Sequence, residues 1–209
     1  MRNQHKLIYV HDPMCSWCWA FRPVLGRLIE NLPGNVRLLR LLGGLAPDNG
    51  QPMAQDMRAY LEDTWRRIQQ RVPGTDFNFD FWTTCSPRRS TWPACRAVIA
   101  ARHLQADKES AMIEAIQQAY YLEARNPSEQ KTLVALAGEI GLDPLSFRET
   151  LEAPNTDQML KDEITEARRL GAVSFPSLRL VTAGAAWPIS VDYRDVTPML
   201  DTIESILAS

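Results

Sequence analysis

The sequence predicts an α/β protein in which a four-stranded sheet is interrupted by a large block of helices. Three observations predict this fold class. Residues 6–42 have the pattern strand, helix, strand; residues 51–171 have helical patterns; and residues 176–209 return to two short strands and a helix. When the helical block is set aside, the remaining order is βαβ followed by ββα, which forms one sheet covered by helices.

The first unit combines two buried strands with one amphipathic helix. Residues 7–10 are rich in β-forming side chains, and residues 36–42 are apolar enough to lie inside a sheet. Between them, residues 19–31 place apolar side chains at helical spacing, and Pro33-Gly34 ends that helix. A unit of this length predicts a parallel pair of strands with a right-handed crossover.

The middle of the chain predicts several consecutive helices. Apolar side chains recur at helical spacing across 53–68, 93–104, 112–120, 133–140 and 160–167. Residues 77–81 alternate aromatic and polar side chains, and we interpret this short stretch as an extended linker. Residues 126–129, Asn-Pro-Ser-Glu, predict a capping box with proline at the first helical position. Asp143-Pro144 predicts a further helix start.

The end of the chain returns to sheet. Residues 176–182 alternate, Ala183-Gly184 forms a turn and residues 185–189 come back, which predicts a hairpin. Thr197-Pro198 begins a final helix. We therefore predict one domain made of residues 1–45 and 172–209, with residues 46–171 inserted as a helical domain.

Two cysteines near the start of the first helix are the candidate redox site. Cys15 and Cys18 enclose Ser16 and Trp17. On a helix, residues i and i+3 share a face about 5–6 Å apart, which is near enough for a disulfide after small adjustment. The positive end of the helix favours a thiolate on the first cysteine. The pattern predicts thiol–disulfide exchange with Cys15 as nucleophile and Cys18 as resolving thiol.

Three stretches carry a family resemblance: residues 12–19, Asp-Pro-Met-Cys-Ser-Trp-Cys-Trp; Gly43-Gly44-Leu45; and residues 171–177, Gly-Ala-Val-Ser-Phe-Pro-Ser. With them the chain resembles the DsbA-like branch of the thioredoxin superfamily, and within it the cytoplasmic FrnE-like group of disulfide oxidoreductases. The resemblance implies a thioredoxin-like core with an all-helical insertion, and a cis Pro176 beside the dithiol. Phe175, Pro176 and an exposed Trp17 are then expected to bind substrate, Phe175 through its backbone.

Two positions depart from this resemblance. Many thioredoxin-like proteins have a buried acid six residues before the first cysteine, where this chain has Tyr9. Strongly oxidising relatives have a histidine between the cysteines, where this chain has Ser16-Trp17. Because neither position supplies a charge, we predict a reductase or isomerase type of site. His11 and Asp12 precede the motif, where either tuning of the thiol or a solvated turn accounts for them.

The remaining cysteines, Cys85 and Cys95, are ten residues apart, which does not fit the spacing of a second zinc-binding pair. No metal site is therefore predicted. We interpret the two as packed thiols, and a second redox pair is the sharper hypothesis. Three other functions stay open: a glutathione-dependent transferase or isomerase on the same fold, a metal-binding or structural module, and a chaperone-like holdase.

The bulk properties narrow the partners and the location. The chain has 209 residues and a formal net charge of −2, which gives no electrostatic reason to expect nucleic acid or an anionic membrane. Without an 18-residue apolar run or a signal-peptide pattern, the sequence predicts a cytoplasmic protein. The expected partners are protein or small-molecule thiols and disulfides, with glutathione or a thioredoxin-type protein recycling the dithiol. No cofactor is expected.

Overall fold

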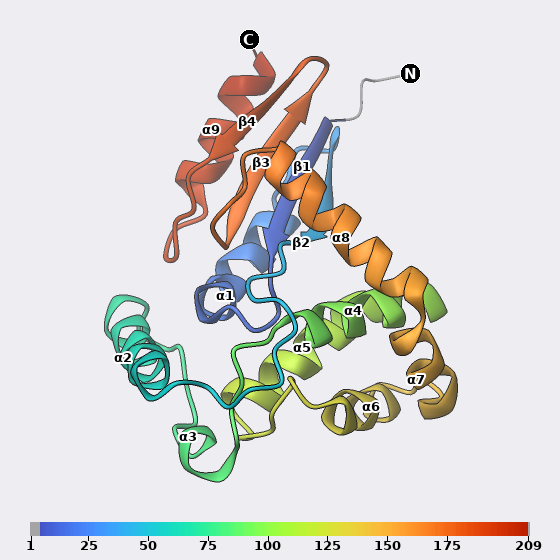
Figure 1. The fold of residues 1–209 in the computed structure, drawn as a ribbon. Helices are drawn as coiled ribbons and strands as arrows, with labels where there is room; N and C mark the ends of the chain where they lie inside the picture. Colours follow the sequence, from blue (N-terminus) through green and yellow to red (C-terminus); the bar gives the residue numbers. More distant parts are fainter. Residues whose placement is uncertain (1–4, 209) are drawn as a thin grey trace.

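The computed structural model describes residues 5–208 (Figure 1). Most element bounds lie within a few residues of the predicted ones. In chain order the elements are β1 (His5–His11), α1 (Ser16–Glu30), β2 (Val36–Leu42), α2 (Gln55–Arg71), α3 (Phe81–Thr84), α4 (Trp92–Leu104), α5 (Lys108–Tyr121), α6 (Gln130–Glu139), α7 (Pro144–Glu152), α8 (Pro154–Arg169), β3 (Ser177–Thr182), β4 (Ala185–Ile189) and α9 (Thr197–Ala208).

The four strands form one mixed sheet in the order β2-β1-β3-β4. β1 pairs in parallel with β2, so that Leu7 lies opposite Leu38, and pairs antiparallel with β3, so that Leu7 also lies opposite Leu180. β3 and β4 form the antiparallel hairpin. The predicted thioredoxin-like core with a helical insertion is confirmed.

Both faces of the sheet are covered, because successive side chains of a strand point to opposite faces. Leu7 and Tyr9 of β1 pack on one face with apolar residues of α1 and α9. Ile8 and Val10 pack on the other face with Ala167 of α8. β1 is therefore a central strand, and the turn that carries Cys15 follows its last residue.

The helices of the insertion lie beyond the end of β1, and α8 runs back from them along the sheet (Figure 1). Their hydrophobic core centres on α4 and also takes in Met14, Ala20 and Leu42 from the first unit. At the end of β2, the Leu42 N–H donates to the Glu163 carboxylate of α8 at 2.7 Å. The two parts of the chain thus share a core next to the dithiol, and the domain boundaries at residues 45 and 171 stay a prediction.

Three local predictions differ from the structure. Helix α1 begins at Ser16, three residues before the predicted start, so that Cys18 lies on the helix. Helix α6 begins only at Gln130, because the Asn126 side chain accepts from the Ser128 N–H and closes a separate turn. Residues 77–81 were predicted to be extended, but residues 79–80 form a turn in which Asp80 has helical backbone angles, and Phe81 already begins α3.

The aromatic residues of the 77–81 stretch belong to the core of the insertion. The rings of Phe77 and Phe79 pack on Trp65 of α2, with ring centroids 4.8 Å and 5.7 Å away. Phe81 adds a third contact to the same indole. The stretch is therefore a packed connection between α2 and α3. None of the helices within residues 5–208 is long and apolar enough to cross a membrane.

Candidate functional site

The dithiol lies at the N-terminus of α1. Cys15 is the N-cap residue, and its carbonyl accepts the Trp19 N–H at 3.0 Å as the first bond of the helix. Cys18 lies one turn further in and hydrogen-bonds with Cys15. Both are buried, with exposed fractions of 6% for Cys15 and 1% for Cys18. The first turn of α1 contains no acidic residue.

The loop before β3 faces this turn. The Phe175–Pro176 peptide bond is cis, and the Cys15 thiol donates to the Phe175 carbonyl at 3.5 Å. The Phe175 ring lies over Gly43, where an added Cβ would come within 2.1 Å of the ring. The three stretches that carry the resemblance are therefore neighbours in space: the cysteine turn, the glycine loop after β2 and the proline loop. Whether Phe175 and Pro176 bind substrate stays a prediction.

A groove of about 310 Å³ opens beside Cys15, between the proline loop and the helical insertion. Its lining includes Trp17, Phe175 and two guanidinium groups from the insertion, Arg88 and Arg89. Trp17 is only half exposed, in contrast to the expectation, because its ring packs on Tyr193 with centroids 5.1 Å apart. The groove is thus partly apolar and partly cationic.

Asp12 is fully buried, so the solvated-turn interpretation is wrong. Its carboxylate accepts from the Met14 and Leu45 N–H groups, both at 2.8 Å, and from the Thr91 hydroxyl at 2.6 Å. Burial raises the pKa of this carboxyl, and the hydrogen bonds oppose that rise. Asp12 thus fastens the cysteine turn to the glycine loop and to the start of α4.

The second pair of cysteines is not brought together. The Cys95 thiol is fully buried and donates to Asp12 at 3.4 Å, whereas the Cys85 thiol donates to the Ala124 carbonyl at 2.9 Å. Burial raises the pKa of both thiols. All four cysteines are free, and residues 5–208 hold no cluster of side chains suited to a metal ion. The Cys85–Cys95 redox pair stays a hypothesis without a supporting contact.

Behind Cys18, on the side away from the groove, lie two residues of β1. The Tyr9 hydroxyl is within hydrogen-bonding reach of the Cys18 sulfur, and the His11 ring stacks on Tyr9 with centroids 4.9 Å apart. Burial raises the pKa of Cys18 well above its usual range and, with nearby Arg40 and Arg102, lowers the pKa of His11 to about 3.

Sequence reasoning left His11 between tuning of the thiol and a solvated turn, and did not predict its burial behind Cys18. The available signal was the period of the strand, because Tyr9 and His11 must share the face that carries Leu7.

Comparisons with known proteins show the family of the chain. A family model described as a DSBA-like thioredoxin domain matches residues 6–187. The cytosolic disulfide reductase DsbM from Pseudomonas aeruginosa is 27% identical with a TM-score of 0.77, covering 97% of this chain and 98% of that one. A structure of DsbM with glutathione gives 25% identity and a TM-score of 0.75, covering 98% of this chain and 100% of that one.

Two other known proteins are less similar to the chain in sequence. A candidate disulfide isomerase from Nitrosomonas europaea has a TM-score of 0.84 at 24% identity, with 98% of each chain covered. The ClpXP adapter protein SpxH of Halalkalibacterium halodurans is 22% identical over 170 residues, which is 79% of this chain and 55% of that protein. The chain thus spans only about half the length of this curated relative. From the family match over most of its length, together with its sheet order and helical insertion, the chain belongs to the DSBA-like thioredoxin domain family.

Proposed function

We propose that this chain is a thiol–disulfide oxidoreductase of the reductase or isomerase type. The observation that carries the proposal is the unequal placement of the two thiols. Cys15 caps α1 and lines the groove, whereas Cys18 lies behind it in the first turn of the helix. The first thiol is placed to meet a substrate, and the second to meet only the first.

In the proposed reaction the Cys15 thiolate attacks one sulfur of a substrate disulfide, and the other sulfur leaves as a thiolate that takes a proton. This gives a mixed disulfide on Cys15. Cys18 then loses its proton and attacks the Cys15 sulfur, which releases the second substrate thiol. The dithiol is oxidised by two electrons, and the substrate disulfide is reduced to two thiols.

The direction rests on what surrounds Cys15. Between the cysteines, Ser16 and Trp17 offer no charge that would stabilise the reduced site as strongly as in an oxidase. The name of DsbM describes a cytosolic disulfide reductase, which supports both the reductase type and a cytoplasmic location as proposals for this chain.

Glutathione is the reductant, or the substrate as its disulfide, that the groove fits best. It offers a thiol and two carboxylates within one small peptide. The groove offers Arg88 and Arg89 on the wall of the insertion that faces Cys15. Arg88 donates to the Ser128 carbonyl at 3.0 Å, while Arg89 makes no ion pair within residues 5–208. Guanidinium groups bind carboxylates well through paired hydrogen bonds. The DsbM structure with glutathione supports the same class of ligand.

The test combines a redox titration with a trap. In glutathione buffers we expect a reversible Cys15–Cys18 disulfide at an intermediate potential, between about −180 and −270 mV. Cys18→Ala should accumulate a mixed disulfide on Cys15, detected by mass spectrometry, and Cys15→Ala should form none. Absence of any reversible disulfide would refute the proposal. Full turnover by Cys18→Ser would instead favour a single-thiol glutathione transferase.

A further inference from the structure

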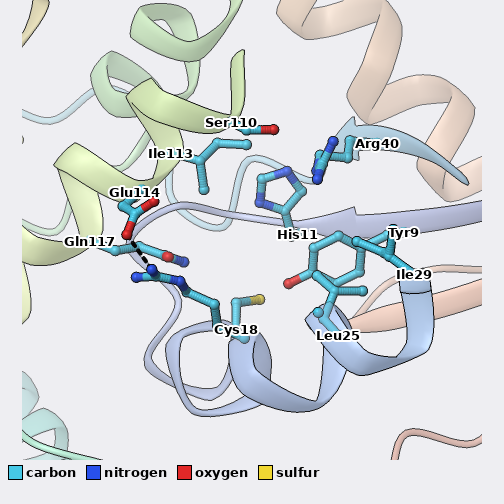
Figure 2. Close-up of a pocket in the computed structure, with 12 residues that line it drawn as sticks. Tyr9, His11, Cys18, Leu25, Ile29, Arg40, Ser110, Ile113, Glu114 and Gln117 are labelled. Atoms are coloured by element: carbon cyan, nitrogen blue, oxygen red, sulfur yellow. Dashed lines mark hydrogen bonds and ion pairs between the residues drawn. The ribbon is translucent and has the colours of Figure 1, made fainter. Parts of the chain in front are cut away.

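A second cavity lies behind the dithiol, separate from the groove. Its volume is about 230 Å³, and it is lined by residues of β1, β2, α1 and α5. Figure 2 shows the Cys18 sulfur at one side of it, with the Tyr9 hydroxyl turned toward Cys18 and the His11 ring projecting toward α5. Leu25, Ile29 and Ile113 supply apolar wall. The buried thiol of Cys18 therefore borders a space that the groove does not reach.

The cavity contains polar groups whose hydrogen bonds are unmet. Neither ring nitrogen of His11 has a partner among the described residues, and the same holds for the Gln117 carbonyl oxygen. His11 is 1% exposed and Gln117 3% exposed. Buried polar groups are nearly always hydrogen-bonded, to protein or to ordered water, and water needs a site with several polar partners. A volume of about 230 Å³ has room for several water molecules.

We propose that this cavity is the proton route of the resolving thiol: water held by Tyr9, His11 and Gln117 carries the Cys18 proton to solvent at the rim formed by Arg22 and Glu114. The proposal rests on the proposed function and specifies its second step. Cys18 must lose a proton before it can attack the mixed disulfide, and once substrate fills the groove the cavity is the open side of Cys18.

His11 is suited to passing a proton on and not to holding one. Since burial keeps its ring neutral, with a pKa of about 3, one nitrogen accepts a hydrogen bond while the other donates one. A proton taken from Cys18 can thus be handed on without resting on the imidazole. Tyr9 donates to Cys18 and stabilises the thiolate that remains. The Cys18 sulfur then attacks Cys15, and the substrate thiolate that leaves is protonated from the solvent in the groove.

The other charged groups near the cavity are already engaged. The Arg22 guanidinium pairs with Glu114 at the rim, and Arg40 and Arg102 pair with Glu109. Arginine keeps its proton, and both carboxylates already accept hydrogen bonds from arginine or form ion pairs with it. The titratable and charged groups that face Cys18 or His11 are Tyr9, Asp12, Cys15, Arg22, Arg40, Arg102, Glu109, Glu114, Tyr121 and Tyr193.

A two-phase experiment separates the two thiols. The reduced protein is mixed with an aromatic disulfide that releases a coloured thiolate, once when Cys15 attacks and again when Cys18 resolves. In His11→Phe, which keeps the stacking on Tyr9 but removes both nitrogens, we expect the second phase to slow about tenfold or more. The first phase should be unchanged. His11→Gln restores polar atoms, and its second phase should recover most of the wild-type rate.

The controls make each outcome decisive. Ile113→Val alters the same wall without a polar group and should leave both phases unchanged, whereas Ile113→Phe fills the cavity from α5 and should slow the second phase. A wild-type second phase in His11→Phe or in Ile113→Phe overturns the proton route. An equally slow His11→Gln also overturns it, because the loss would then come from packing. If the wild-type protein shows no first phase, the proposed function itself is refuted.

Discussion

The two sides of the dithiol are built for different tasks. On the Cys15 side the groove joins apolar rings to the guanidinium groups of Arg88 and Arg89, a surface that suits a thiol-containing peptide. On the Cys18 side the cavity offers a neutral imidazole and an amide, groups that suit water. The proposed reaction has the same asymmetry, because Cys15 lines the groove and Cys18 borders the cavity.

The same contrast separates two consecutive residues. Asp12 is buried and accepts hydrogen bonds from two backbone N–H groups, a hydroxyl and a thiol. His11 is equally buried, and its ring nitrogens have no hydrogen-bond partner among residues 5–208. Asp12 therefore holds the turn in place, whereas His11 lines the cavity with its nitrogens unpaired. Substitution of Asp12 should therefore lower the stability of the fold, whereas substitution of His11 should slow the second phase of the reaction.

The largest effect that we expect is a loss of stability in acid, caused by the buried His11. The folded-state pKa of about 3 lies below the ordinary value of 6.5, so between these values the unfolded chain binds a proton that the folded chain does not. Stability must then fall as the pH is lowered, by about 3 kcal/mol between about pH 7 and about pH 4. Urea unfolding of wild type and His11→Phe at both pH values measures the difference. Equal losses in the two proteins would contradict a buried neutral His11.

Asp12→Asn should destabilise the protein by about 1–3 kcal/mol, because it leaves a buried donor unsatisfied. Each carboxylate oxygen accepts a backbone N–H, one from Met14 and one from Leu45, so either orientation of an amide places its NH₂ group against a donor. Chemical denaturation reports the loss, with the exposed Asp201→Asn as the matched control. An Asp12→Asn protein as stable as the control would show that this carboxylate does not fasten the turn.

Part of the fold and of the site could be predicted from the sequence. Strand β2 and hairpin strand β4 have the predicted bounds, and Cys15 lies at the start of the helix that follows β1, as expected. These features depend on local pattern and spacing. The burial of His11 and Asp12 does not, because it is produced by α4 and α5, which follow much later in the chain. A His-Asp-Pro sequence after a strand is typical of an exposed turn until distant helices cover it.

Spatial neighbours explain another part that sequence alone left unexplained. The Gly43-Gly44 pair was recognised only through the resemblance, and the structure supplies its reason. Gly43 lies under the Phe175 ring, and Gly44 has a positive φ of 59° with Ile164 of α8 above it. Both requirements come from elements more than a hundred residues away in sequence, so no local pattern could reveal them.

Gly43→Ala should affect the groove side and spare the cavity side. The new methyl group overlaps the Phe175 ring, and overpacking of this kind costs about 1–3 kcal/mol, toward the lower end here because the half-buried ring can swing outward. Displacing Phe175 also moves the carbonyl that accepts the Cys15 thiol. We expect a slower first phase and an unchanged second phase in the two-phase experiment. Gly34→Ala, whose Cβ meets no atom within 4 Å, is the control.

The smallest expected effect tests whether the groove arginines recognise charge. Arg89 is half exposed, so solvent screens its attraction for a carboxylate and about 1 kcal/mol is expected, or a fivefold rise in KM for glutathione disulfide in Arg89→Ala. The turnover number should not change, because the guanidinium does not touch the thiols. Arg89→Lys should recover part of the loss, and the exposed Arg169→Ala should change nothing. If a neutral aromatic disulfide suffers the same rise in KM, then Arg89 shapes the groove and does not read the charge of glutathione.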